Sequence, residues 1–93
     1  MKYKIEQKIS FKKGLKLSLN RGKDEAKIKF VINELANGRQ LEPKYNDHKL
    51  WNSKKYKDCR ECHIEPDWLL IYKIEDDKLI LTLTNTGTHS DLY

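Results

Sequence analysis

One apolar run constrains the fold of this chain more than any other feature. It is WLLIYKI, residues 68–74, and it lies between two polar turns, EPD at 65–67 and EDD at 75–77. A short run of large apolar residues bounded by turn residues is typical of a buried strand. The flanking segments 56–64 and 78–84 alternate between polar and apolar residues, as half-buried strands do. Because short turns join sequential strands as neighbours, the three segments are predicted to form an antiparallel sheet.

The N-terminal part of the chain carries a helical pattern instead. Residues 2–8 alternate loosely and are predicted to form a short edge strand. A first helix is predicted because apolar residues recur at every fourth position: Phe11, Leu15 and Leu19. Ser10 is the candidate N-cap of this helix, and residues 20–22 (NRG) end it. Gly14 lies inside the helix, where glycine costs about 1 kcal/mol relative to alanine.

A second helix is predicted to begin after Asp24, a good N-cap residue, and to end at Asn37-Gly38. Its apolar stripe is expected to lie in the core: Ile28, Val31, Ile32 and Leu35. The two helices form a hairpin, so the element order is β-α-α-β-β-β. This order predicts an α+β fold with the helical hairpin on one face of a small antiparallel sheet. Residues 1–93 are expected to form one domain. Residues 39–55 are expected to form a long surface loop, with a helical turn as an alternative within it.

The charge of the chain is unevenly distributed. Residues 1–60 contain 17 Lys or Arg and 7 acidic residues, whereas residues 61–93 contain 2 and 7. The first segment therefore has a net charge of +10 and the second −5. Such asymmetry favours a polyanionic partner, most simply a nucleic acid, although a solvated lysine-rich surface is the alternative. No secretory signal and no run of about 18 apolar residues is visible, so a cytoplasmic location without membrane contact is expected.

The string CRECH at residues 59–63 fits the C-x-x-C-H pattern of c-type haem attachment. That haem requires export to an oxidising compartment and a second axial ligand, yet Met1 is the only methionine. A zinc site is also disfavoured, because the adjacent Cys62 and His63 point to opposite faces of a strand. Cys62 is interpreted as a small buried hydrophobe and Cys59 as a partly exposed thiol without a role. No metal and no cofactor is expected.

Only three histidines occur, His48, His63 and His89, and Asp67 follows His63 across a turn. A group of this kind suits RNA cleavage by an attacking 2′-hydroxyl. That reaction needs a base for the 2′ proton, an acid for the leaving 5′ oxygen, and positive charge at the phosphate. Imidazole can serve as either acid or base near neutral pH, and no metal is required. Taken singly, each histidine is more commonly an ordinary surface residue.

Three motifs in the chain resemble the YafQ branch of the RelE/ParE toxin superfamily. They are DHKL at 47–50, RECHIEPDWLLIY at 60–72 and TGTHSDLY at 86–93. The second string is long and specific, and all three histidines fall on family motif positions. Leu41-x-Pro43 and the preceding helical hairpin also fit, so the resemblance covers nearly the whole chain.

The resemblance implies an mRNA interferase, the toxin of a type II toxin–antitoxin pair, which cuts mRNA on the ribosome. Carried over by position, the acid–base group would be His48, His63, Asp67 and His89. Tyr93 would stand where the family has a terminal aromatic, usually phenylalanine, close to the RNA. Trp68 also matches, although a tryptophan that opens a buried strand is more often a core residue. The partners implied are a cognate antitoxin, mRNA and the ribosome with its 16S rRNA. Operator DNA would be bound only through the antitoxin complex.

The chain departs from the family pattern at the expected phosphate-binding position. The family usually has an arginine just before the TG-[ST]-H motif, but this chain has Asn85 there and no arginine in residues 61–93. Arg60, Lys54 and Lys55 are the candidate substitutes. The alternative function is therefore a weakly catalytic or non-catalytic toxin-like protein that binds RNA or the ribosome. A ParE-like action on DNA gyrase is a third possibility, but it leaves the His/Asp group without a role.

Overall fold

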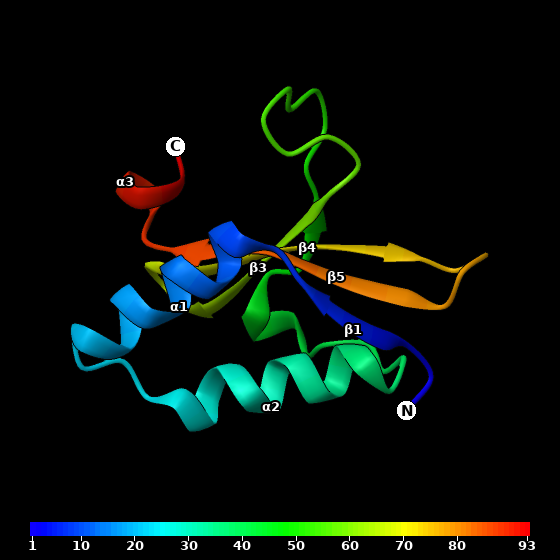
Figure 1. Ribbon diagram of the computed structural model, residues 1–93, viewed down its shortest axis with the longest axis horizontal. Helices are drawn as coiled ribbons and strands as arrows, with labels where there is room; N and C mark the ends of the chain where they lie inside the picture. The colour runs from blue at the N-terminus through cyan, green and yellow to red at the C-terminus, as the bar shows by residue number, and fades with distance from the viewer.

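A computed structural model describes all residues from 1 to 93 (Figure 1). A five-stranded sheet forms its centre, and two longer helices lie on one side of that sheet. The elements in chain order are β1 (Lys4–Gln7), α1 (Ile9–Asn20), α2 (Glu25–Ala36), the 3-10 turn η1 (Pro43–Tyr45), β2 (His48–Lys49), β3 (Arg60–Glu65), β4 (Trp68–Glu75), β5 (Ile80–Gly87) and α3 (His89–Leu92).

The strand order in the sheet is β1-β5-β4-β3-β2. Strands β2 to β5 are antiparallel neighbours, and β1 pairs with β5 in parallel. The helical hairpin therefore serves as the crossover that a parallel pair requires. The predicted α+β architecture and its order of elements are confirmed, with β2 and α3 as additional short elements. The sheet is mixed and not antiparallel throughout as predicted, because the helical crossover brings β1 parallel to β5.

The apolar run forms β4 at the centre of the sheet, and both of its faces are buried. Trp68, Leu70 and Tyr72 face the helices and pack in the main core with residues of α1 and α2. Leu69 and Ile71 face the other way and pack with a smaller cluster, formed with Tyr56, Cys59 and Leu92. Because successive strand residues point to opposite faces, a strand covered on both sides reads as a continuous apolar run. We call the sheet face opposite α1 and α2 the second face.

Helices α1 and α2 have different N-caps. Asp24 is the N-cap of α2, as predicted, and its side chain accepts from the backbone N–H of Ala26. The prediction that Ser10 caps α1 is wrong, because α1 begins at Ile9 and its N-cap is Lys8, two residues before Ser10. The hydroxyl of Ser10 instead donates to the carbonyl oxygen of Thr84 at 2.5 Å, which ties α1 to β5.

The strand boundaries near the C-terminus also differ from the predictions. The strand expected at 56–64 begins only at Arg60, because residues 54–58 form turns. The strand expected at 78–84 begins at Ile80 and continues to Gly87. The loop expected at 39–55 contains η1 and β2. No helix is long and apolar enough to cross a membrane.

The two cysteines are both buried. Cys62 has no exposed surface and lies in the main core, which confirms its interpretation as a small hydrophobe. The interpretation of Cys59 as a partly exposed thiol is wrong, because it packs against the second face beside Tyr56. Burial also raises the pKa of the Cys62 thiol well above its ordinary value. Neither cysteine forms a disulfide.

Candidate active site

The three histidines come together on the second face, although they are far apart in sequence. His48 lies on the short strand β2, His63 on β3 and His89 at the first position of α3. The ring centroids of His48 and His63 are 6.3 Å apart, and those of His63 and His89 are 5.8 Å apart. His63 therefore lies between the other two imidazoles, and one ligand can contact all three.

Strand alternation explains why His63 points to this face. Its neighbours Cys62 and Ile64 are buried in the main core under the helices. Glu61, two residues before His63, shares its orientation and is paired with His48 in the β2–β3 ladder. Side chains that are two residues apart or directly paired project from the same face of a sheet. The register of three strands thus fixes the position of His48 and His63.

Asp67 holds His89 from the turn between β3 and β4. One carboxylate oxygen, Oδ1, lies 2.6 Å from Nδ1 of His89 and accepts from its backbone N–H at 2.9 Å. Both contacts lower the pKa of Asp67 below its usual value, and the hydrogen bond from the His89 backbone is the larger cause. An ionised carboxylate can only accept a hydrogen bond, so Nδ1 of His89 carries a proton and donates it to Asp67 as a hydrogen bond. The other ring nitrogen, Nε2, is then free to exchange protons. Both side chains are exposed, and substrate can therefore reach them.

The short helix α3 fixes the backbone at His89. Thr88 is its N-cap and accepts from the backbone N–H of Asp91, while the Asp91 carboxylate accepts from the backbone N–H of Thr88. Arg21, at the end of α1, donates to the same carboxylate at 2.7 Å. Arg21 and the Thr88 N–H lower the pKa of Asp91 to about 2. Asp91 thus stays ionised and attaches α3 to the rest of the molecule.

Glu61 is a buried carboxylate in the middle of the site that sequence reasoning missed. Its side chain is only 7% exposed, and its Oε1 lies 3.5 Å from Nε2 of His48 and 3.4 Å from Nε2 of His63. Its other oxygen accepts from the hydroxyl of Tyr93. A buried carboxylate requires such partners, because burial without them is costly. The signal in the sequence was its two-residue spacing from His63, but that spacing is common on any strand.

His48 is held from two sides. Its Nδ1 is 2.7 Å from the carbonyl oxygen of Asn46, which adopts a left-handed conformation with φ of 46°. A carbonyl can only accept, so Nδ1 carries the proton in this contact. Nε2 is then the atom directed toward Glu61, at the side of the ring that faces His63.

Tyr93 closes the site at the C-terminal end of the chain. Its ring packs edge-on against Tyr56, with centroids 5.7 Å apart. Burial and the contact with Glu61 raise the pKa of the Tyr93 hydroxyl above its usual value, so this hydroxyl remains a donor. Lys55 lies close by and donates to the carbonyl oxygen of Leu92 at 2.8 Å. Lys54 is exposed on the same loop.

The chain is similar over its whole length to a known family of toxins. The model of the family described as "Bacterial toxin of type II toxin-antitoxin system, YafQ" matches residues 3–93. The chain belongs to this family. It is 41% identical over 90 residues to the mRNA interferase toxin YafQ of Escherichia coli strain B, covering 96% of this chain and 94% of that protein. It is therefore a toxin and an endoribonuclease of the mRNA interferase class.

Solved structures of family members have the same fold. The crystal structure of the E. coli DinJ–YafQ complex superposes with a TM-score of 0.87 at 40% identity, covering 98% of both chains. A metal-bound toxin from Helicobacter pylori superposes with a TM-score of 0.89 at 40% identity, covering 98% of this chain and 99% of that one. The α+β fold is therefore the fold of the YafQ family.

Two of the candidate substrate-binding residues lie elsewhere: Trp68, which the resemblance implied, and Arg60, a candidate substitute for the missing arginine. Trp68 is 1% exposed and is buried in the main core, so it has no surface to offer to RNA. This part of the prediction is wrong because Trp68 begins the central strand with its side chain toward the helices. Arg60 points away from the second face and donates to both oxygens of Asp47 at 3.3 Å. Tyr72 donates to the same carboxylate, so Arg60 belongs to a separate cluster.

Asn85, which stands where the family has arginine, does lie on the second face, opposite Ile71 in the β4–β5 ladder. Its side-chain amide donates to the hydroxyl of Tyr56 at 3.3 Å, and its oxygen accepts from the backbone N–H of Thr86. These contacts engage Asn85 within the protein. Lys55 is a cation at this end of the site, where it donates to the carbonyl oxygen of Leu92 at 2.8 Å.

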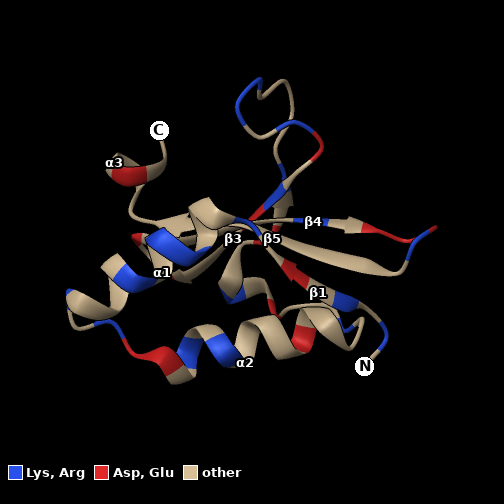
Figure 2. Cartoon of the chain, in the orientation of Figure 1, with Lys and Arg blue, Asp and Glu red and all other residues tan.

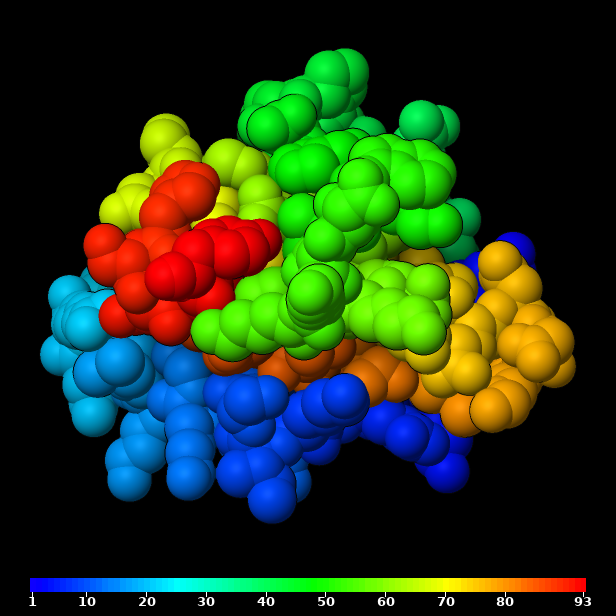
Figure 3. Space-filling model, turned by 90° about the horizontal axis from the view of Figure 1, so that it is seen from above, coloured from blue at the N-terminus to red at the C-terminus, as the bar shows by residue number.

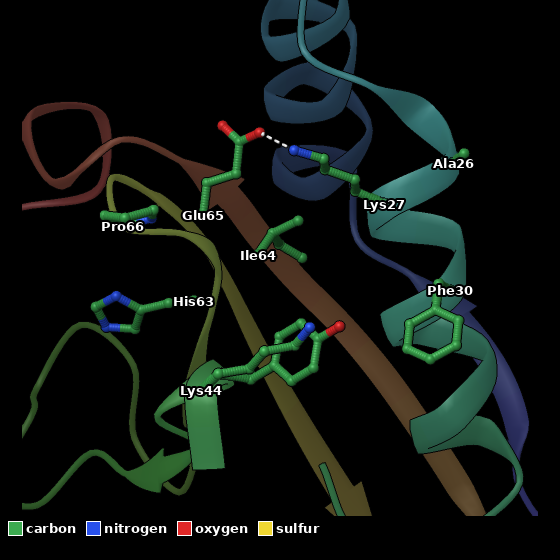
Figure 4. A pocket seen from close by; sticks show the side chains of 9 residues that line it. Ala26, Lys27, Phe30, Lys44, His63, Ile64, Glu65 and Pro66 are labelled. Carbon is green, nitrogen blue, oxygen red and sulfur yellow. Dashed lines mark hydrogen bonds and ion pairs between the residues drawn. The ribbon is translucent and has the colours of Figure 1, made fainter. Parts of the chain in front are cut away.

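A groove of about 740 Å³ borders the site on the side of α2. Figure 4 shows that His63 and Ile64 project to opposite sides of β3, with Phe30 and Lys27 of α2 across the groove from Ile64. Of the catalytic candidates only His63 reaches its edge. Lys27 and Lys23 both donate to Glu65, which lowers the pKa of that carboxyl group. The groove is therefore distinct from the cluster of histidines.

No group of three or more His, Cys, Asp and Glu residues is placed to hold a metal ion. Cys62 and His63 of the CRECH string face opposite sides of β3, as strand alternation predicted.

Proposed function

We propose that this toxin cleaves mRNA on the ribosome by metal-independent general acid–base catalysis, with the 2′-hydroxyl of the substrate as nucleophile. The observation that supports this most strongly is the convergence of His48, His63 and His89 with Asp67 on one face. These side chains provide several proton-transfer groups within reach of one ribose–phosphate linkage, which is what this reaction needs.

The reaction needs two imidazoles, one neutral and one protonated. A neutral imidazole accepts the proton of the 2′-hydroxyl while the 2′-oxygen forms a bond to phosphorus. A protonated imidazole donates to the 5′-oxygen as its bond to phosphorus breaks. The products are a 2′,3′-cyclic phosphate and a 5′-hydroxyl, and no water or metal enters this step. Imidazole is suited to both roles because its unperturbed pKa, about 6.5, is close to neutral pH.

The two carboxylates act on the imidazoles and not on the RNA. Asp67 orients His89 through Nδ1 and stabilises positive charge on that ring. Glu61 has the corresponding position between His48 and His63. We assign His48, His63 and His89 as the catalytic group that exchanges protons, and Asp67 and Glu61 as the residues that position these rings.

The phosphate requires positive charge, and this chain supplies it differently from the usual family pattern. Lys55 and Lys54 are the candidates on the loop beside Tyr93, whereas Asn85 is engaged with Tyr56. A charge-assisted hydrogen bond is about twice as strong as a neutral one, so asparagine at position 85 binds a phosphate more weakly than arginine would. This observation favours a second candidate function, a toxin-like protein that binds RNA or the ribosome and cleaves slowly or not at all.

The partners follow from the proposed family function. A cognate antitoxin would bind this chain, as DinJ binds YafQ in the E. coli complex. Binding of operator DNA would occur only through the toxin–antitoxin complex. The site of action would be the cytoplasm, where mRNA and ribosomes, with their 16S rRNA, are found.

A growth assay with mapped cleavage tests the proposal. Expression of the chain without antitoxin should stop growth, and primer extension on mRNA from a translation reaction should show discrete cuts. Asp67→Asn and His89→Gln should abolish the cuts, whereas Ser90→Ala should retain them. Ser90 is a matched control because it is exposed beside His89 and makes no site contact. Binding or inhibition without cuts would support the second candidate instead.

Sulfur substitution at the scissile phosphate tests metal independence. A metal ion that contacts a non-bridging oxygen loses that contact with sulfur in Mg²⁺, and Mn²⁺ restores it because Mn²⁺ binds sulfur better. We expect the rate of each phosphorothioate isomer to be the same in the two metals. Selective rescue of one isomer by Mn²⁺ would contradict a metal-independent reaction.

A further inference from the structure

The segment between β2 and β3, residues 50–59, projects from the second face of the sheet (Figure 1). We call this segment the Trp51 loop. Its base is closed by the backbone N–H of Leu50, which donates to the carbonyl oxygen of Cys59 at 3.0 Å. Its middle is anchored by the Tyr56 hydroxyl, which donates to the carbonyl oxygen of Leu92 at 3.0 Å. The loop is therefore a fixed element of the structure.

Trp51 is the most exposed aromatic side chain of the protein. It is 75% exposed, so its indole ring contributes almost nothing to either core cluster. The ammonium group of Lys49 lies 4.6 Å from the centroid of its ring. A cation at this distance is attracted to one face of the indole. Lys49 therefore lies over one face of the Trp51 ring, while most of the indole surface remains exposed for a partner.

The charges around Trp51 are mostly positive. Residues 49–58 contain four lysines, at 49, 54, 55 and 57, and one acidic residue, Asp58. All four lysine side chains are exposed. Figure 2 shows these basic positions on the loop at the side of the molecule opposite α2. A net charge of +3 on ten residues favours contact with phosphates.

The loop also adjoins the candidate active site, because Tyr56 packs against Tyr93. Lys49 follows His48 in β2 but pairs with Arg60, so its side chain leaves the opposite face of the strand. Figure 3 shows the loop side by side with the C-terminal segment that carries His89 and Tyr93. An RNA strand held at the histidines therefore has neighbouring nucleotides, or the surrounding RNA, close to Trp51.

We propose that the Trp51 loop is a second RNA site, in which the indole ring of Trp51 stacks on an unpaired nucleobase and the surrounding lysines contact phosphates. Aromatic platforms combined with cations are the common means of binding single-stranded nucleic acid, because every base offers a face for stacking. The base belongs either to the mRNA outside the cleaved linkage or to an unpaired position of rRNA. The inference rests on the proposed function, since it extends the same RNA interface.

Ribosome binding by variants in a His89→Gln background tests this inference without interference from cleavage. Trp51→Ala should weaken binding to mRNA-programmed ribosomes by about 5- to 100-fold, the range typical of one lost stacking contact. Trp51→Phe should retain most of the affinity, because phenylalanine can still stack. Phe30→Ala is the matched control, since Phe30 is 51% exposed on α2, on the other side of the molecule, and its loss should change nothing. A thermal unfolding curve should be unchanged for each variant, because the substituted rings are exposed.

Repeating the measurement with ribosomes that lack mRNA shows whether the stacked base belongs to mRNA or to rRNA. An equal loss of affinity there assigns the base to rRNA, and a loss seen only with mRNA present assigns it to the message. Equal binding by Trp51→Ala and its parent in both arms would overturn the inference. Weakened binding of the antitoxin alone would also overturn it, since the loop would then be a protein interface. Failure of the parent itself to bind ribosomes would instead contradict the proposed function.

Discussion

At the residue scale, the contact pattern of Glu61 is the most informative feature of the site. A buried carboxylate lies between Nε2 atoms of His48 and His63 and accepts from the Tyr93 hydroxyl. The hydroxyl of the C-terminal tyrosine gives Glu61 one more partner. The Glu61 carboxylate therefore contacts both imidazoles at the nitrogen that faces the site.

Glu61→Gln should lower the single-turnover cleavage rate by roughly 10-fold or more, since efficient acid–base catalysis contributes about 10²–10⁴-fold. Glutamine keeps the size of the side chain but loses the charge that orients and stabilises both rings. The pH–rate profile should also shift, which loss of packing alone would not cause. Tyr93→Phe serves as the control that removes one hydrogen bond and keeps the carboxylate. A variant with the parent's rate and pH profile would show that Glu61 has no part in the reaction.

The Arg21–Asp91 ion pair makes stability depend on pH at the acid end. The pKa of Asp91 is lowered from 3.8 to about 2 in the folded protein. A lowered pKa stabilises the fold above the unfolded pKa, and this contribution is lost as pH falls from about 4 to about 2. The difference in unfolding free energy between the parent and Asp91→Asn should therefore be full at pH 6 and mostly lost at pH 2, as measured by urea unfolding.

Asp77→Asn provides the comparison for this experiment, because Asp77 lies in the exposed turn after β4 and makes no ion pair. Its effect on unfolding should be small and independent of pH. An Asp91→Asn difference that persists unchanged at pH 2 would mean that the carboxylate is not held by Arg21.

Single residues show where sequence reasoning succeeded and failed at the site. Strand alternation correctly separated Cys62 from His63, because a period of two needs no tertiary information. The same pattern could not show that Glu61 is buried, since the groups that cover it come from β2 and the C-terminus. Trp68 was placed at the RNA by resemblance, yet its side chain faces the core. A motif gives the position of a residue in the chain, but the register of the sheet decides which way it points.

At the element scale, the close approach of α1 to β5 explains a residue that helix propensity disfavours. A Cβ atom added at Gly14 would lie 2.2 Å from the carbonyl oxygen of Thr86 and 3.0 Å from the side-chain oxygen of Asn85. The helix can therefore contact the strand only because Gly14 has no side chain. This contact supports the end of β5, from which the chain enters α3 and His89.

Gly14→Ala should destabilise the fold by about 1–3 kcal/mol, the usual cost of overpacking. Helix propensity alone predicts the opposite sign, a gain of about 1 kcal/mol. Lys12→Ala is the control, because Lys12 is on the exposed side of the same helix. Urea unfolding measures both variants, and a stabilised Gly14→Ala would contradict the close packing of α1 on β5.

The elements that sequence predicted best are those whose burial is periodic. The stripe of α2 and its Asp24 cap were predicted correctly, because both signals are local. The C-terminal segment was not, because β5 continues through Asn85 to Gly87 before α3 begins. The polar residues in that part of β5 pair with buried Leu70 and Ile71, and only the tertiary structure reveals these partners. The parallel β1–β5 pair is likewise a long-range feature without a local signal.

At the scale of the whole molecule, charge and chemistry are divided between different parts of the chain. The segment with net charge +10 supplies β2 and the Trp51 loop, whereas the segment with net charge −5 supplies His63, Asp67 and His89. The sheet joins the two parts, because β2 pairs with β3 and the loop contacts the C-terminus. The basic part can attract RNA while the acidic residues of the other part orient the imidazoles.

The central claim is that these imidazoles act on one ribose–phosphate linkage through its 2′-hydroxyl. The most direct measurement is single-turnover cleavage of an mRNA with a single 2′-deoxy substitution at the mapped cut, compared with the all-ribose mRNA on the same ribosomes. We predict that the deoxy substitution abolishes cleavage at that linkage while binding is unchanged, and that the all-ribose product ends in a 2′,3′-cyclic phosphate. Cleavage of the deoxy substrate at a similar rate, or a product with a 3′-hydroxyl end, would contradict the mechanism.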